Sequence, residues 1–152
     1  MYLQRLSFIL FVLFCSFLFS SCSKSGWYGN YEGTSTESSQ ISRSEGGETK
    51  FFTGGRTTTG DTVSFINEKK IVSVTIKETC KLRLFIEDYT RARVAPGQIC
   101  KLSINGYEGK VTITGQAYFE GNGKLMIQFV GVAVEPNYNG GYVFNFTGER
   151  SE

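Results

Sequence analysis

The sequence predicts an all-β chain. Beyond residue 70, apolar residues alternate with polar ones, which is the period of strands with one buried face. The dipeptides Asn105-Gly106 and Asn122-Gly123 separate such runs and favour tight hairpin turns, because both residues tolerate positive φ. No run combines a 3.6-residue period with helix caps. We therefore expect one antiparallel barrel of about eight strands, with a two-sheet β-sandwich as the alternative.

The first half of the predicted domain is the less regular. Trp27 and Tyr31 are four positions apart, so a strand here places both on one face. The polar stretch 38–44 fits an edge strand or a loop equally well, because Ile41 is its single aliphatic residue. The next segments are predicted as a short strand ending in a Gly-Gly turn (48–55), a loop (57–61) and a second short strand (62–66).

The second half alternates more clearly. Strands are predicted at 72–76, 81–87, 99–104, 111–119, 125–133 and 142–147. The irregular stretch 88–97 includes a short strand around 90–94, and 136–141 is predicted as a turn region. The last three strands are joined by short turns and predict a meander. Four small residues within these strands suit a curved sheet and favour the barrel, namely Gly115, Ala117, Gly131 and Ala133.

The N-terminus has the three parts of a secretory signal: Arg5, an apolar run over residues 6–19, and small residues after it. A membrane-spanning helix needs roughly 20 residues, so a retained anchor is the weaker interpretation. Ser20-Ser21-Cys22 resembles the lipobox of bacterial lipoproteins. The resemblance implies cleavage before Cys22, a diacylglycerol on its sulfur and an acyl chain such as palmitate on its amine. Ordinary cleavage after Cys22 or Ser23 is the alternative.

Two stretches resemble small Bacteroidota lipoproteins with calycin-like barrels: Ser-Cys-Ser-Lys (21–24) followed by a strand with Trp27, and the closing strand Phe144–Arg150. The resemblance implies a lipid-anchored outer-membrane protein, with Arg150 packed over Trp27. Ser23 replaces the Asp that signals inner-membrane retention, and no acidic run follows, so the periplasmic face is favoured over the cell surface. The predicted parts are a signal peptide (1–21), a short tether (22–26) and a barrel domain (27–152).

Two cysteines remain for the domain, Cys80 and Cys100. In an exported protein such a pair predicts a disulfide. It would close a loop of about 21 residues and contribute on the order of 3 kcal/mol on the chain-entropy model. Two free thiols, or a redox or metal-binding pair, are the alternatives. The spacing is unlike C-x-x-C and the chain contains no His to complete a metal site, so no cofactor is expected.

The composition excludes several function classes. The chain has 16 basic and 14 acidic residues, and without Arg5 the mature charge is 15 − 14 = +1. No basic block indicates nucleic-acid binding. Without His, neither Ser-His-Asp nor Cys-His catalysis is available. Glu87 and Asp88 are adjacent and would point to opposite faces of a strand, unlike a glycosidase pair. We expect a protein that is not an enzyme.

A non-enzymatic binding module remains, in two forms. One is a carrier with a small apolar ligand inside an open barrel. The other is a protein-interaction module, such as an inhibitor, an adhesin or an envelope-complex subunit. Four aromatic residues are large enough to fill the barrel, namely Phe119, Phe129, Phe144 and Phe146. Residue types common at binding hot spots cluster around the disulfide loop, and the candidate partner-binding residues are Tyr89, Arg91, Arg93 and Tyr107.

Overall fold

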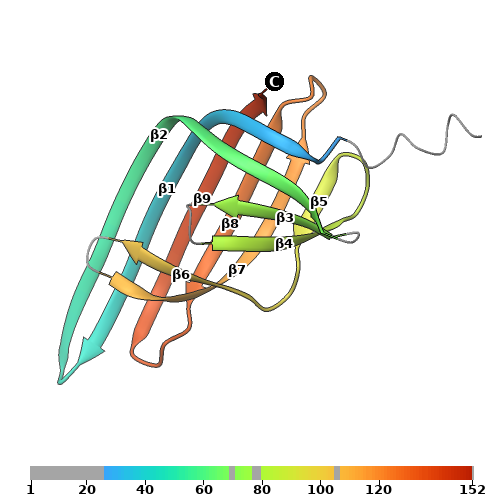
Figure 1. Ribbon diagram of the computed structural model, residues 1–152. Helices are drawn as coiled ribbons and strands as arrows, with labels where there is room; N and C mark the ends of the chain where they lie inside the picture. Colours follow the sequence, from blue (N-terminus) through green and yellow to red (C-terminus); the bar gives the residue numbers. More distant parts are fainter. Residues whose placement is uncertain (1–25, 69–70, 77–79, 105–106, 152) are drawn as a thin grey trace, which may run out of the picture.

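The structure of the chain is a computed structural model that describes residues 26–68, 71–76, 80–104 and 107–151. These residues form nine strands and no helix (Figure 1). The strands are β1 (Gly29–Glu45), β2 (Glu48–Glu68), β3 (Ile71–Ile76), β4 (Cys80–Ile86), β5 (Arg91–Val94), β6 (Gln98–Ile104), β7 (Tyr107–Phe119), β8 (Leu125–Ala133) and β9 (Tyr138–Arg150).

Eight of the strands close into an antiparallel barrel. The ring runs β1-β2-β3-β4-β5-β7-β8-β9, and β9 pairs with β1 to complete it. The predicted barrel is confirmed, and the alternative sandwich is excluded. The predicted C-terminal meander is also confirmed, because β7, β8 and β9 are neighbours in sequence order.

The ninth strand, β6, lies outside the ring. It pairs with the first half of β7, residues 107–113, whereas β5 pairs with residues 116–118. Both strands use the same edge of β7, because β8 occupies the other edge. The disulfide between Cys80 and Cys100 then ties β6 to the start of β4. Its Cα atoms are 5.3 Å apart and both cysteines are buried, which confirms the predicted bond.

The first half of the domain differs from its prediction. Residues 48–66 form one continuous strand within β2, where two short strands and a loop were expected. The reason is tertiary: Gly54 and Gly55 pair with Ser39 and Ser38 of β1, and this ladder overrides their turn preference. The register of the β1–β2 ladder shifts once, at Gly60. This residue has no partner in β1 and forms a β-bulge with φ +68°.

Two further segment predictions were wrong. The polar stretch 38–44 is neither an edge strand nor a loop, because residues 38–43 lie within β1 and pair with β2 on one side and β9 on the other. The region 136–141 was predicted as a turn, but β9 already begins at Tyr138 and pairs back onto Arg43. The hairpin of β1 and β2 extends beyond the neighbouring strands at its tip (Figure 1).

Alternation along the strands places large aromatic side chains inside the barrel. Phe129, Phe144 and Phe146 are at most 1% exposed, and Tyr142 is equally buried. Phe129 and Phe144 stack with their ring centroids 6.3 Å apart. Phe119 is only partly buried and packs against the core. Of the four aromatic residues named as large enough to fill the barrel, three are therefore buried inside it and Phe119 is partly buried.

Small residues let the wall of the barrel bend tightly. Gly115 has φ +136°, a conformation that L side chains rarely adopt. A Cβ atom at this position would overlap the main-chain oxygen of Gln128 on β8, and the Phe129 side chain lies directly over the glycine. The predicted link between Gly115 and sheet curvature is therefore supported by its backbone geometry.

Candidate functional site

The turn from Glu87 to Arg91 joins β4 to β5 and is held by the side chain of Asp88. Its Oδ1 atom accepts hydrogen bonds from Thr90 N (2.7 Å), Thr90 Oγ1 (2.8 Å) and Arg91 N (2.8 Å). These bonds, led by the one from the Thr90 hydroxyl, lower the pKa of the Asp88 carboxyl. An Asp in this role fixes a turn by replacing a backbone contact. The turn is thus rigid although its side chains are exposed to water.

Trp27 lies beneath this turn and is fully buried. Its indole Nε1 donates a hydrogen bond to the Asp88 main-chain oxygen at 3.3 Å. The ring centroid is 4.7 Å from that of Phe119 and 5.8 Å from that of Phe65. Tyr31 shares the buried face with Trp27, as the sequence predicts. The aromatic cluster and the turn together close this end of the barrel.

Arg150 was expected to lie over Trp27. Its guanidinium donates to the main-chain oxygen of Tyr28, the residue after Trp27, and lies beside Gly29. The positive charge also opposes the effect of burial on Tyr31, whose pKa is raised because desolvation is the larger influence. Arg150 therefore fastens the end of β9 to the start of β1.

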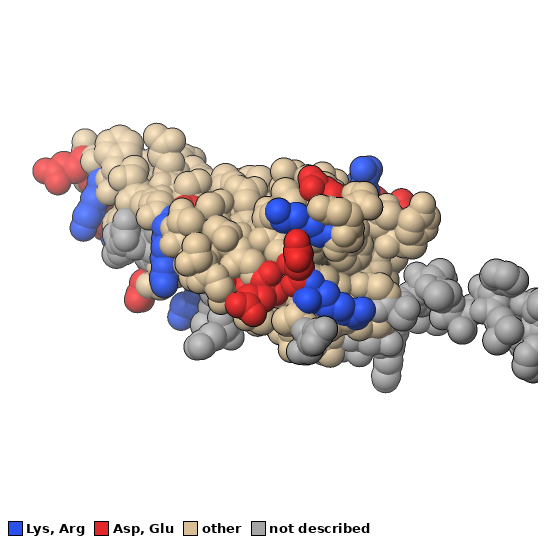
Figure 2. Space-filling view, turned by 90° about the horizontal axis from the view of Figure 1, so that it is seen from above, with Lys and Arg blue, Asp and Glu red and all other residues tan. Residues whose placement is uncertain are grey.

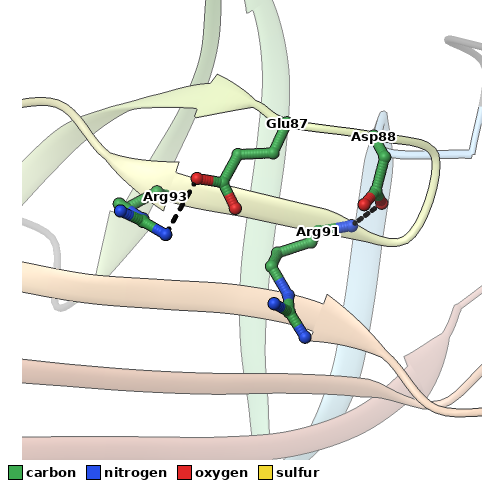
Figure 3. Close-up of polar contacts among 4 residues, drawn as sticks. All are labelled: Glu87, Asp88, Arg91 and Arg93. Carbon is green, nitrogen blue, oxygen red and sulfur yellow. Dashed lines mark hydrogen bonds and ion pairs between the residues drawn. The ribbon is translucent and has the colours of Figure 1, made fainter.

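The outward side chains around β5 form a mixed basic and aromatic surface. Arg93 makes an ion pair with Glu87 at 3.0 Å (Figure 3). Arg91 extends toward β7, where its paired residue is Tyr118. Phe85 of β4 pairs with Arg93 and is 52% exposed. We call this surface the β5 face, and its residues are Phe85, Arg91, Arg93, Gln116 and Tyr118.

The energetic role of the ion pair is modest. The side chains of Arg93 and Glu87 are 64% and 35% exposed, and exposed pairs of this kind contribute about 0–1 kcal/mol. Its effect is on orientation, because it holds the Arg93 guanidinium on the outside of the barrel. Tyr89 stands at the tip of the turn and is 75% exposed.

Three of the predicted binding residues come together. Tyr89, Arg91 and Arg93 lie on the turn and on β5, within five positions of one another. Tyr107 does not join them, because it starts β7, whereas Arg91 pairs near the end of that strand. Its side chain is outside the described part of the structure. Cys22 also lies outside the described residues, so its predicted lipid attachment stays a prediction.

Sequence reasoning missed Phe85 and Tyr118. Phe85 lies between Leu84 and Ile86, so the alternation of the strand places its side chain on the outward face. A large aromatic residue at an outward position is unusual in a strand with one buried face. That signal was available in the sequence. Tyr118 carried no such signal, because its position beside Arg91 follows only from the pairing of β5 with β7.

A second group of polar residues faces the interior along β1. Ser35 and Ser39 are buried there, and Tyr142 pairs with Ser39 from β9. Burial raises the pKa of the Tyr142 hydroxyl strongly, and the negative charges of Glu37 and Asp61 raise it further. The tyrosine therefore stays neutral and remains part of the core at neutral pH.

Open hollows occur on the outer surface. One of about 380 Å³ lies at the tip of the β1–β2 hairpin and is lined by Arg43, Glu45, Glu48, Thr49 and Lys50. Another of about 250 Å³ is lined by Lys101, Leu102, Ser103 and Glu108. Neither is lined by the aromatic residues of the core. On the face that Figure 2 shows, acidic and basic side chains lie in small mixed groups among largely uncharged residues.

Within the described ranges, no group of three or more His, Cys, Asp or Glu side chains could hold a metal ion. Among those same residues, no helix is long and apolar enough to cross a membrane. No model of a known protein family matches the chain, and neither a curated protein nor a solved structure is significantly similar to it. The site must therefore be interpreted from its own geometry.

Proposed function

We propose that the protein is a tethered, non-enzymatic protein-binding module of the bacterial outer membrane. A lipid on Cys22 anchors it, the periplasmic leaflet is the favoured location, and the β5 face contacts the partner. The observation that carries the proposal is the rigid presentation of exposed arginine and aromatic side chains on a barrel whose described interior is packed.

The packed interior favours a protein partner over a small apolar ligand. Ligand pockets enclose roughly 300–1,000 Å³ and are usually preformed. Here the space is occupied by the rings of Phe129, Tyr142, Phe144 and Phe146, each nearly inaccessible to solvent. A ligand inside the barrel would have to displace these side chains and lose their packing energy. The carrier function is therefore the less favoured of the two.

The β5 face has the chemistry of a binding hot spot. Arginine, tyrosine and tryptophan dominate the residues whose truncation costs protein interfaces most. Asp88 holds the backbone at Thr90 and Arg91 by three hydrogen bonds, so little backbone entropy is lost when a partner binds the arginines that follow. Phe85 beside them supplies apolar area. The arginines favour a partner with acidic side chains around an apolar contact.

Anchoring by Cys22 agrees with the way the barrel begins. Trp27 is locked into the core, so the predicted tether consists of the residues from Cys22 to Gly26. Several acyl chains on one cysteine give stable membrane attachment, whereas a single chain is marginal. The domain then stays at the membrane surface and meets partners there.

The proposal is tested by photo-cross-linking in cells that express the full chain. A photoreactive amino acid replaces Phe85 on the β5 face or, as the control, Thr36, which is exposed on β1 and paired with Thr57 and Asn145. We expect a discrete cross-linked protein from position 85 and none from position 36. The same adducts from both positions would contradict a specific face.

Two mass measurements complete the test. The intact mass of the mature protein is expected to include the acyl groups on Cys22, and a mass without them would refute the anchor. Native mass spectrometry is expected to find no small molecule bound to the purified protein. A stoichiometric apolar compound would instead favour the carrier function.

A further inference from the structure

We propose that the barrel stands on the lipid bilayer with the end that carries the turn 87–91, so that Tyr89 lies among the lipid head groups. In this orientation the tip of the β1–β2 hairpin points away from the membrane. The inference rests on the proposed function, because it requires the lipid on Cys22. It adds which end of the barrel meets the bilayer and which side chain contacts it.

The chain enters the barrel at this end. The Gly26 main-chain oxygen accepts a hydrogen bond of 2.6 Å from the Tyr31 hydroxyl, and Trp27 is buried under Asp88. This hydrogen bond and the one from Trp27 to Asp88 therefore fix the start of the domain, Gly26 and Trp27, beside the turn 87–91. Four peptide steps separate Cys22 from Gly26, and an extended chain spans at most about 3.6 Å per residue, so the tether reaches about 14 Å.

That reach is short compared with the membrane and the barrel. Each head-group region is roughly 5–8 Å thick, because a bilayer measures about 30 Å across its hydrocarbon core and 40–45 Å in total. β1 has 17 residues, and at about 3.3 Å per residue its far end lies up to about 55 Å from its start, several times the reach of the tether. An acylated Cys22 can therefore hold the Trp27 end at the head groups but cannot bring the hairpin tip there in an upright barrel.

Tyr89 is the side chain at this end best suited to the interface. It is 75% exposed at the tip of the turn, and the turn itself is held by Asp88 and rests on Trp27. Tyrosine is enriched at membrane surfaces because its ring is apolar and its hydroxyl is polar. A rigid turn presents the ring with little loss of entropy on contact.

Charge does not dominate this end. Among the described residues of this end, the cations Arg91, Lys124 and Arg150 are accompanied by the exposed acids Asp88, Glu120 and Glu149. The contact should therefore form on uncharged phosphatidylcholine as well as on anionic lipid, unlike that of a polybasic segment. At the hairpin tip, residues 43–50 are polar or glycine, with Arg43 and Glu45 in an ion pair of 2.6 Å, and Phe51 behind them is 66% exposed. Exposed aromatic area alone therefore does not separate the two ends, and the reach of the tether decides which end meets the bilayer. Figure 1 shows this tip and the β4–β5 turn at opposite ends of the molecule.

The experiment places an environment-sensitive fluorophore on single cysteines in the acylated, full-length mature protein. The positions are Tyr89→Cys, Asn122→Cys in the β7–β8 turn at the same end, and Glu45→Cys at the hairpin tip. Cys80 and Cys100 do not react, because they form the buried disulfide. The protein is placed in phosphatidylcholine vesicles with and without a lipid that carries a quencher in its head-group region.

We expect a blue-shifted emission and loss of most of the fluorescence at position 89, and a water-like, unquenched emission at position 45. Partial quenching at position 122 agrees with an upright barrel and tests the orientation independently of any damage by the Tyr89 substitution. Equal quenching at positions 45 and 89, or quenching at 45 alone, would overturn the proposal.

Failure of the orientation and failure of the proposed function are distinguishable. A protein whose mass includes the acyl groups, and which sediments with vesicles while positions 89 and 122 stay unquenched, is anchored but does not stand on this end. A protein without acyl groups refutes the anchor itself. As the matched control, the chain produced from residue 22 onward with Cys22→Ser, which has neither the signal segment nor acyl groups, should lose the blue shift of the label at position 89, because the tyrosine contact alone is too small to bind the bilayer.

Discussion

The indole Nε1 of Trp27 donates a hydrogen bond to the main-chain oxygen of Asp88, a residue 61 positions away. The bond joins the first core residue of the domain to the turn that closes the same end of the barrel. It therefore couples the N-terminal entry of the chain, and the predicted lipid anchor next to it, to the candidate binding residues on β5.

Truncation of Trp27 should destabilise the domain strongly. Trp27→Ala removes a fully buried ring that packs on Phe65 and Phe119, and such changes cost about 3–5 kcal/mol. Trp27→Phe keeps part of the packing and should cost less. The measurement is urea unfolding followed by far-UV circular dichroism, because Trp27 is the only tryptophan. A loss below about 1 kcal/mol for the alanine variant would contradict this role.

Removal of the disulfide should loosen β6 first. The double variant Cys80→Ser, Cys100→Ser is expected to lose about 3 kcal/mol, because the cross-link joins two residues that are 20 positions apart. Hydrogen exchange should accelerate most in β6, which pairs with β7 on one side only and lies outside the ring. Uniform acceleration in all strands would show that the bond supports the whole barrel instead. A reducing agent should leave the double variant unchanged.

Acid should open the turn 87–91 before it unfolds the barrel. The pKa of Asp88 is lowered in the folded state, so its ionised form stabilises the turn above the ordinary Asp pKa, and this contribution is lost as the pH falls through the lowered value. The amide exchange of Arg91, whose N–H is bonded to Asp88, reports the opening. Asp88→Asn should remove the pH dependence, since an amide oxygen still accepts these bonds. An unchanged acid response in that variant would refute the assignment.

Alkali should destabilise the core through Tyr142. Its raised pKa means that the folded state keeps the proton, so stability is complete below the ordinary tyrosine pKa of about 10 and is lost as the pH rises toward the raised folded value. Tyr142→Phe should shift the alkaline unfolding midpoint to higher pH. The midpoint is followed by circular dichroism. The same midpoint in both proteins would show that other groups control the transition.

Substitution of two glycines tests whether the bend of the barrel wall requires a residue without a Cβ atom at position 115. Gly115→Ala forces a Cβ atom against the β8 main chain at φ +136°, and we expect a loss of about 1–3 kcal/mol. The matched control is Gly55→Ala, whose Cβ would meet its nearest neighbour, the Glu37 main-chain oxygen, at 3.5 Å. There the substitution should be neutral or stabilise by about 0.4–1 kcal/mol, because it restricts the unfolded chain. Thermal unfolding of both variants measures the difference, and equal effects would contradict the prediction.

Local pattern was a reliable guide where each strand has one buried face. Leu82, Leu84 and Cys80 share a parity in β4, and all three are buried. The disulfide between Cys80 and Cys100 was also predicted from the sequence, because two cysteines in the domain of an exported chain most simply bond to each other. Burial depends on alternation, and alternation is a local property of a strand.

Long-range pairing decided the rest. The pair Gly54-Gly55 is typical of a turn, yet both residues lie within β2. The reason is that β1 pairs with β2 by backbone hydrogen bonds along its whole length. Part of the candidate site could not be predicted from the sequence. Arg91 and Arg93 were named from their residue types, but their positions opposite Tyr118 and Gln116 arise from the short pairing of β5 with β7.

By itself, the sequence determined the all-β class, the inward and outward parity of most strands and the disulfide. Tertiary structure alone decided that β6 lies outside the ring, that the polar stretch 38–43 is a central strand, and that Trp27 supports the turn at Asp88. The physical reason is that parity follows from each residue's own neighbours, whereas strand order follows from which backbone edges remain free once the ring has closed.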